Sequence, residues 1–120
     1  MYFVPFNEKL WRRMSILVYY NQKHDVMIKT LMYHKVEDFD KWKEAFDDLR
    51  PIRIKAGEMD YSVGTIHGQP NTAYVINGWK TMKDYEAFVG SSVLADAMKR
   101  AGVLEKPHTF VMDEVEMVTK

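Results

Sequence analysis

Two segments of the chain repeat one another in a way that restricts the fold. Residues 41–46 (KWKEAF) and 83–88 (KDYEAF) match at four of six positions. Each segment lies in a stretch whose apolar residues recur with helical spacing, the first through Phe39, Trp42 and Phe46. The repeat therefore predicts one strand–helix–strand unit that is used twice.

The segments around these helices alternate like β-strands. Strands are expected over 27–36, 59–67, 72–79 and 108–118, with Gly64 as a bulge. The order of elements is then strand, helix, strand, strand, helix, strand. We predict an α+β fold, a ferredoxin-like βαββαβ sandwich in which helices cover one face of a four-stranded antiparallel sheet.

Capping residues set the expected ends of the helices. Asp38 is expected to cap the first helix, and Pro51 to end or kink it before a stop at Gly57. Thr81, followed three residues later by an acidic residue, resembles a capping box at the start of the second helical region. Gly102 is expected to end that region.

Composition excludes several classes of function. The 120 residues carry 17 Lys and Arg against 17 Asp and Glu, without the basic excess typical of nucleic-acid binding. There is no cysteine, and no two of the four histidines have the i, i+4 spacing of a zinc-binding helix. No apolar run approaches the ~20 residues of a membrane span. We expect a cytoplasmic protein that binds no metal, nucleic acid or membrane.

Residues 1–26 differ in charge from the remainder of the chain. They hold four basic and two acidic residues, whereas residues 27–120 hold 13 and 15. Five apolar residues follow one helical stripe: Leu10, Trp11, Met14, Leu17 and Val18. We expect residues 1–26 to be a helical extension that packs on a domain formed by residues 27–120.

Apolar residues occupy both faces of the expected sheet. Tyr74 and Ile76 alternate with Val75 along one strand, so that each face receives large apolar side chains. The helices can cover only one face, and a second copy of the chain would cover the other. We therefore expect a homodimer, a dimeric α+β barrel with a cavity between two sheets.

Several segments of this region carry a family resemblance. They are 34–36 (HKV), 39–46 (FDKWKEAF), 70–71 (PN), a strand that ends in Trp79, and 98–103 (MKRAGV). The region from residue 27 to about 118 resembles the antibiotic biosynthesis monooxygenases of the dimeric α+β barrel superfamily. Residues 1–26 have no counterpart in this resemblance.

The resemblance implies oxygenation, without flavin, metal or other cofactor, of a small aromatic or polyketide-like compound. Haem-degrading relatives fit less well, because Val89 stands where their helix histidine is expected. Two alternatives use the same cavity: a non-catalytic dimer that binds a small ligand or is associated with stress, and a polyketide cyclase or isomerase. Whether the chain is an enzyme is left open at this stage.

The resemblance also implies site residues. Trp79 and Tyr85 match family aromatic positions, as a stacking wall and a hydroxyl that binds the substrate. The asparagine expected four residues before the tryptophan is Val75 here, with Asn77 nearby and placed on the opposite strand face. Trp79 and Tyr85 can equally be core aromatics.

His34 is the candidate general base, because a neutral imidazole can remove a proton from a phenol near neutral pH. Strand parity leaves open whether it faces the barrel cavity or the helices, and a histidine hydrogen-bonded in the core is the alternative. We predict His34 and Tyr85 as catalytic residues. The predicted substrate contacts are Trp79, Asn77, Tyr33 and Tyr74.

Overall fold

The computed structural model describes residues 28–119. The elements in these residues are, in chain order, β1 (Ile28–Lys35), α2 (Phe39–Asp48), α3 (Arg50–Ala56), β2 (Glu58–Ile66), β3 (Gln69–Trp79), α4 (Met82–Val89), α5 (Ser92–Arg100) and β4 (His108–Met112). The helix expected within residues 1–26 lies outside the described residues.

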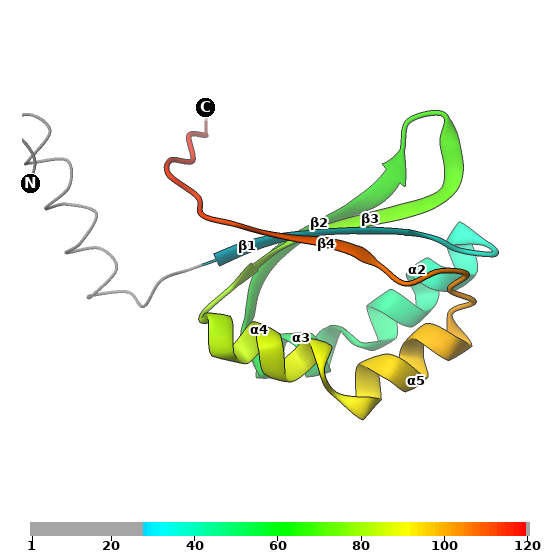
Figure 1. Ribbon diagram of the computed structural model, residues 1–120, viewed down its shortest axis with the longest axis horizontal. Coiled ribbons are helices and arrows are strands. Elements are labelled where there is room, and N and C mark those ends of the chain that lie inside the picture. Colours follow the sequence, from blue (N-terminus) through cyan, green and yellow to red (C-terminus); the bar gives the residue numbers. More distant parts are fainter. Residues whose placement is uncertain (1–27, 120) are drawn as a thin grey trace, which may run out of the picture.

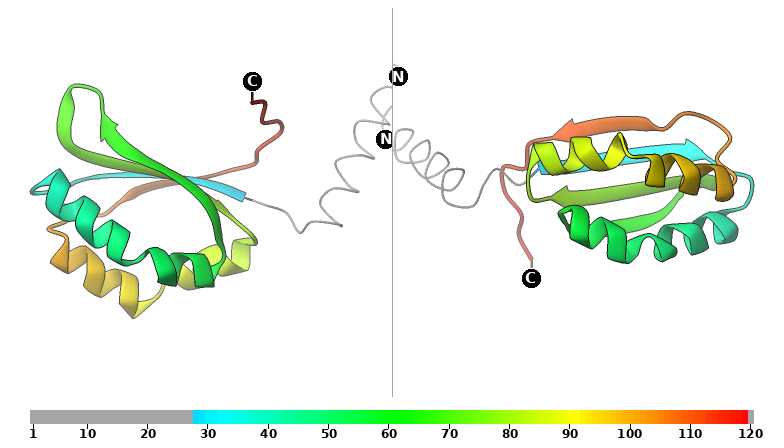
Figure 2. Two further views of the ribbon diagram at one scale, coloured as in Figure 1. Left: turned by 180° about the vertical axis from the view of Figure 1, so that it is seen from behind. Right: turned by 90° about the horizontal axis from the view of Figure 1, so that it is seen from below.

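The four strands form one sheet in the order β2-β3-β1-β4, and every neighbouring pair is antiparallel. The helices all lie on the same face of this sheet, which arches over them (Figure 1, Figure 2). This is the predicted α+β ferredoxin-like arrangement. No helix in the described part of the chain is long and apolar enough to cross a membrane.

Each predicted helical region consists of two short helices. Pro51 lies in the first turn of α3, where its missing N–H breaks no helical hydrogen bond, so it starts a new helix as well as ending α2. Gly57 ends α3 with φ 119°, as expected of a stop residue. In the second region, Ser91 Oγ accepts a hydrogen bond from Leu94 N and caps α5.

The β2–β3 hairpin differs in detail from the prediction. β3 begins at Gln69, three residues earlier than expected, because the turn is confined to His67 and Gly68, the latter with φ 81°. Gly64 is not a bulge: it pairs with Tyr74, and the two register shifts of β2 lie between Glu58 and Asp60 and between Thr65 and Ile66. A Cβ at Gly64 would lie 2.8 Å from Tyr74 Cε2, so this glycine lets an aromatic ring lie flat on the strand.

The fourth strand is shorter than expected. It ends at Met112 instead of continuing to residue 118. Three apolar side chains beyond its end are between 64% and 71% exposed: Val115, Met117 and Val118. In the described chain, residues 113–118 therefore do not pair with the sheet, although apolar and acidic residues alternate there.

The core between sheet and helices has two centres. One contains Val36, Trp42, Ala73, Val75 and Ala101. The other contains Ile28, Trp79, Tyr85 and Phe88. The strands β1 and β3 contribute residues to both centres. One pair of facing residues on these strands, Thr30 and Asn77, is polar and buried.

The opposite face of the sheet carries no helix among the described residues. Its side chains include Leu31, Tyr33, Tyr74 and Ile76, all half-buried, and Phe110, which is 53% exposed. Strand alternation places these residues together, since paired positions share a face. We call these five residues the open face.

Candidate active site

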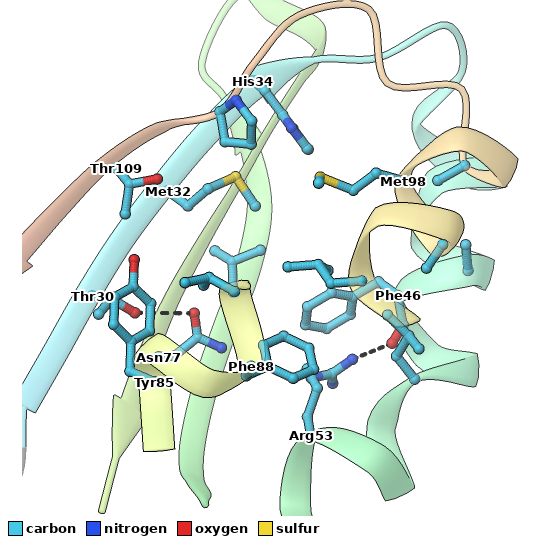
Figure 3. A pocket seen from close by; sticks show the side chains of 18 of the residues that line it. Thr30, Met32, His34, Phe46, Arg53, Asn77, Tyr85, Phe88, Met98 and Thr109 are labelled. Atoms are coloured by element: carbon cyan, nitrogen blue, oxygen red, sulfur yellow. Dashed lines mark hydrogen bonds between the residues drawn. The ribbon is translucent and has the colours of Figure 1, made fainter. Parts of the chain in front are cut away.

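A cavity of about 380 Å³ lies between the sheet and the helices of a single chain. This is the size range of small-molecule sites. Most of its walls are apolar, and they are interrupted by polar side chains: Thr30, His34, Arg53, Asn77, Tyr85, Lys106 and Thr109. Figure 3 labels all of these except Lys106. The sequence led us to expect a cavity between two sheets, whereas this cavity lies on the helix side of one sheet.

His34 faces the helices and the cavity, which decides the parity that the sequence left open. It lies near the end of β1, is 1% exposed, and meets the Trp42 ring edge-on with 5.8 Å between ring centroids. Neither Nδ1 nor Nε2 has a hydrogen-bond partner in the described chain. A buried polar group without a partner is unfavourable, so no hydrogen bond in the described chain explains the burial of this imidazole.

The environment of His34 sets its protonation state. Burial lowers the pKa of His34 to about 4, while the carboxylate of Glu105 raises it and His108 lowers it further. The imidazole is therefore neutral at pH 7, and offers one N–H donor and one nitrogen acceptor to the cavity.

A chain of hydrogen bonds fixes one wall of the cavity. Trp79 Nε1 donates to Thr30 Oγ1 (3.1 Å), and Thr30 Oγ1 donates to Asn77 Oδ1 (3.4 Å). Asn77 and Trp79 share the helix face with Val75, because residues two apart on a strand point the same way. The expectation that Asn77 lies on the opposite strand face from Val75 was wrong for this reason.

Arg53 and Glu58 continue this chain, and the sequence analysis did not identify either. Asn77 Nδ2 donates to Glu58 Oε2 (2.5 Å), and Arg53 Nε lies 3.1 Å from both oxygens of Glu58. Arg53 Nη1 donates to the backbone carbonyl of Phe46. The sequence pattern does not indicate that this pair is buried, because an arginine in a short helix usually faces solvent. The one signal is the opposite charge of Glu58, five residues after Arg53 and beyond Gly57.

The guanidinium of Arg53 packs against the rings of Phe46 and Tyr61. Its Cζ lies 3.6 Å from the centroid of the Phe46 ring and 4.9 Å from that of Tyr61. Its remaining nitrogen, Nη2, is buried without a hydrogen-bond partner among residues 28–119. The cavity thus has a second unpartnered polar group besides His34.

Trp79 and Tyr85 form an aromatic corner of the cavity. Their ring centroids are 5.7 Å apart, and the Phe88 ring lies 5.3 Å from Trp79. Burial raises the pKa of Tyr85, with a hydrogen bond to Thr109 acting in the opposite direction. The Tyr85 hydroxyl is therefore protonated at neutral pH and can donate a hydrogen bond.

The cavity does not include all the predicted contacts. Tyr33 and Tyr74 pair with each other on the open face, where the Tyr33 ring stacks on His108 at 4.7 Å. Four of the predicted site residues line the cavity: His34, Asn77, Trp79 and Tyr85. Across residues 28–119, no three His, Cys, Asp or Glu side chains are grouped as metal ligands.

Three solved structures resemble this fold. A candidate antibiotic biosynthesis monooxygenase from Nitrosomonas europaea is 18% identical, with a TM-score of 0.61 over 74% of this chain and 90% of that one. SnoaB, a cofactor-independent oxygenase from Streptomyces nogalater, is 7% identical, with a TM-score of 0.65 over 78% and 98%. A candidate antibiotic biosynthesis monooxygenase from Caulobacter crescentus is 19% identical, with a TM-score of 0.62 over 82% and 99%.

Sequence comparison adds no closer relative. No family model matches the chain, and no curated protein matches it in sequence. Because sequence identity to the three solved structures is low, the likeness concerns the fold. At that level it confirms the predicted resemblance to antibiotic biosynthesis monooxygenase-like proteins.

Proposed function

We propose that the cavity binds a hydroxylated aromatic or polyketide-like compound with fused rings and that the protein oxygenates it without a cofactor. One observation carries this proposal: His34, buried and neutral, has two nitrogens without a partner in the described chain, and it lines a cavity whose walls are mostly apolar. The fold shared with SnoaB, itself a cofactor-independent oxygenase, supports it.

The reaction balances without an added reductant. A phenol with a free para carbon reacts with dioxygen to give a quinone and water: the para C–H bond breaks, a C=O bond forms there, and the hydroxyl oxygen becomes the second carbonyl. The arene loses four electrons and dioxygen gains four. One oxygen atom enters the product, and the other leaves as water with the two hydrogens.

His34 would start this reaction by accepting the phenol proton. Its low pKa opposes protonation while no anion lies beside it. Proton transfer creates a phenolate next to the imidazolium, and their attraction offsets the cost of burial. The electron-rich phenolate then reacts with dioxygen.

The aromatic corner would hold and stabilise that anion. Trp79 already donates its indole N–H to Thr30, so its contribution to a ligand is the face of its ring. Tyr85 keeps its proton and can donate to the developing negative charge. Asn77 is fixed between Thr30 and Glu58, which keeps this wall rigid and orients a flat substrate.

A homodimer through the open face is part of the proposal. Leu31, Tyr33, Tyr74, Ile76 and Phe110 form an apolar surface, and the same surface of a second copy would cover it. Light scattering should give about twice the chain mass of 14.2 kDa. A Phe110→Asp variant should dissociate, whereas Ile54→Asp on α3 should not. A monomeric wild-type protein at micromolar concentration would reject this assembly.

Oxygen uptake with naphthols that have a free para position tests the reaction. His34→Gln should lower kcat/KM by about 10²–10⁴, the usual contribution of a general base. Tyr85→Phe should lower it by about 10², as expected for one donor to an anion. Tyr33→Phe, on the open face, is the matched control and should leave uptake unchanged. Naphthol binding without oxygen uptake would instead indicate a ligand-binding protein, a cyclase or an isomerase.

A further inference from the structure

Arg53 is a buried polar group of the cavity that the proposed reaction does not use. We propose that its Nη2 donates a hydrogen bond to a neutral oxygen acceptor of the ligand, such as a ketone or quinone carbonyl, at the end of the cavity away from His34. This inference rests on the proposed aromatic ligand and adds which functional group the ligand carries at the end that faces Arg53.

The Arg53 guanidinium is immobilised and has one donor to spare. Glu58 engages Nε, the Phe46 carbonyl engages Nη1, and the side chain is 2% exposed. Nη2 has no partner in the described chain although it is buried. Because a guanidinium is planar, fixing two of its nitrogens also fixes the direction of the third. A ligand oxygen there would satisfy a donor that folding leaves unpaired.

Charge compensation decides which acceptor fits. The carboxylate of Glu58 is 1% exposed and already neutralises Arg53 at 3.1 Å. A ligand carboxylate at Nη2 would bring a second negative charge close to the buried carboxylate of Glu58. A carbonyl oxygen accepts the hydrogen bond without that repulsion, so the pair selects a neutral acceptor over an acid.

The two unpartnered groups lie at opposite ends of the cavity (Figure 3). Arg53 is linked through Glu58 to Asn77, which pairs with Thr30 on β1. Thr30 and His34 are four residues apart on that strand, or about 13 Å at a rise of about 3.3 Å per residue. The ligand that fits is therefore an elongated fused-ring molecule, with a hydroxyl at His34 and a carbonyl at Arg53.

Three naphthols with the second substituent at the far end of the rings test this. Acetylnaphthol carries a ketone there, ethylnaphthol carries an alkyl group without a hydrogen-bond acceptor, and hydroxynaphthoate carries a carboxylate. Fluorescence titration of the wild-type protein should show acetylnaphthol binding about tenfold tighter than ethylnaphthol, the value of a hydrogen bond to a charged donor. Hydroxynaphthoate should bind more weakly than acetylnaphthol.

Two variants separate the donor from its counter-charge. Arg53→Lys removes the second terminal nitrogen and should abolish the preference for the ketone while ethylnaphthol still binds. Arg50→Lys, on the exposed part of the same helix, is its control and should keep the preference. Glu58→Gln removes the compensating charge and should raise the affinity for hydroxynaphthoate about tenfold.

Equal binding of the ketone and ethyl compounds by the wild-type protein would overturn the role of Arg53 and leave the proposed function intact. A ketone preference that survives Arg53→Lys, or tightest binding of the carboxylate, would overturn it too. If neither naphthol binds, the proposed function fails, and the role of Arg53 fails with it. Should Arg53→Lys not fold, the wild-type preference and the Glu58→Gln response decide the question.

Discussion

The two ends of the cavity are equally buried but are built in opposite ways. Arg53 is 2% exposed, its charge is matched by Glu58, and its Nε and Nη1 atoms donate hydrogen bonds. His34 is 1% exposed, uncharged at neutral pH, and hydrogen-bonded to nothing in the described chain. One end is a hydrogen-bonded polar network, and the other is a polar group without a hydrogen bond in the described chain.

This difference separates structural from functional polarity. The Arg53 network links α3, β2 and β3 through hydrogen bonds, so its buried charges have a structural explanation. An apolar side chain would serve the core at position 34 at least as well, because His34 makes no hydrogen bond there. We infer that His34 is retained for a ligand.

The largest effect is expected at the end of the cavity that contains Arg53 and Glu58. Glu58→Ala should lower the free energy of unfolding by about 3–5 kcal/mol, because it leaves the Arg53 charge buried without a partner. The double variant Arg53→Met with Glu58→Gln should recover most of that loss, since no unpaired charge remains. Denaturant titration measures both. A double variant as unstable as Glu58→Ala would mean that packing, and not charge, dominates this end.

The next effect concerns the end that contains His34, and it is a change of stability with pH. The pKa of His34 is about 4 in the folded chain against an ordinary value of 6.5. Between these values the unfolded chain binds a proton that the folded chain does not. Neutral His34 therefore contributes to the free energy of unfolding at pH 7. This contribution, on the order of 3 kcal/mol, is lost as the pH falls from 6.5 to about 4.

His34→Gln should remove that part of the pH dependence, which appears as the difference between wild-type and variant denaturation curves. The carboxylates titrate in both proteins and cancel in this difference. His67→Gln, at an exposed turn, should follow the wild-type slope. Parallel curves for wild type and His34→Gln would show that the imidazole is not buried in its neutral form.

The fold was predictable from local patterns. The helical spacing of Phe39, Trp42 and Phe46, together with the caps at Asp38 and Thr81, gave the order of elements and the positions of the helices. The break between α2 and α3 was only half visible, because a proline at the first turn of a helix can end one helix or start another. Strand ends were less accurate, since pairing, and not alternation, determines where β4 stops.

The site was predictable only where single residues carry the signal. The predicted residues His34, Asn77, Trp79 and Tyr85 line the cavity, and their roles in a reaction stay predictions. Tyr33 and Tyr74 were predicted for a cavity between two sheets, and they lie on the open face, outside the cavity on the helix side. The Arg53 network was missed, since its members come from three elements whose contact no local pattern reveals.

The smallest expected effect tests the hydrogen bonds that join the two ends. Thr30→Val keeps the shape of the side chain but removes the acceptor of the Trp79 indole N–H and the donor to Asn77 Oδ1. The unfolding free energy should fall by about 1–2 kcal/mol, in the lower part of the usual penalty for unsatisfied buried groups, because Asn77 keeps its bond to Glu58.

The control for this variant is Thr65→Val, a half-buried threonine on β2 that faces the same way. It should change stability by no more than about 0.5 kcal/mol. If Thr30→Val is equally silent, the bonds along Thr30, Asn77 and Trp79 contribute nothing to the wall of the cavity. A loss of stability with an unchanged affinity for ethylnaphthol would place the role of Thr30 in folding, and a loss of both would place it in the ordering of the aromatic corner that holds the ligand.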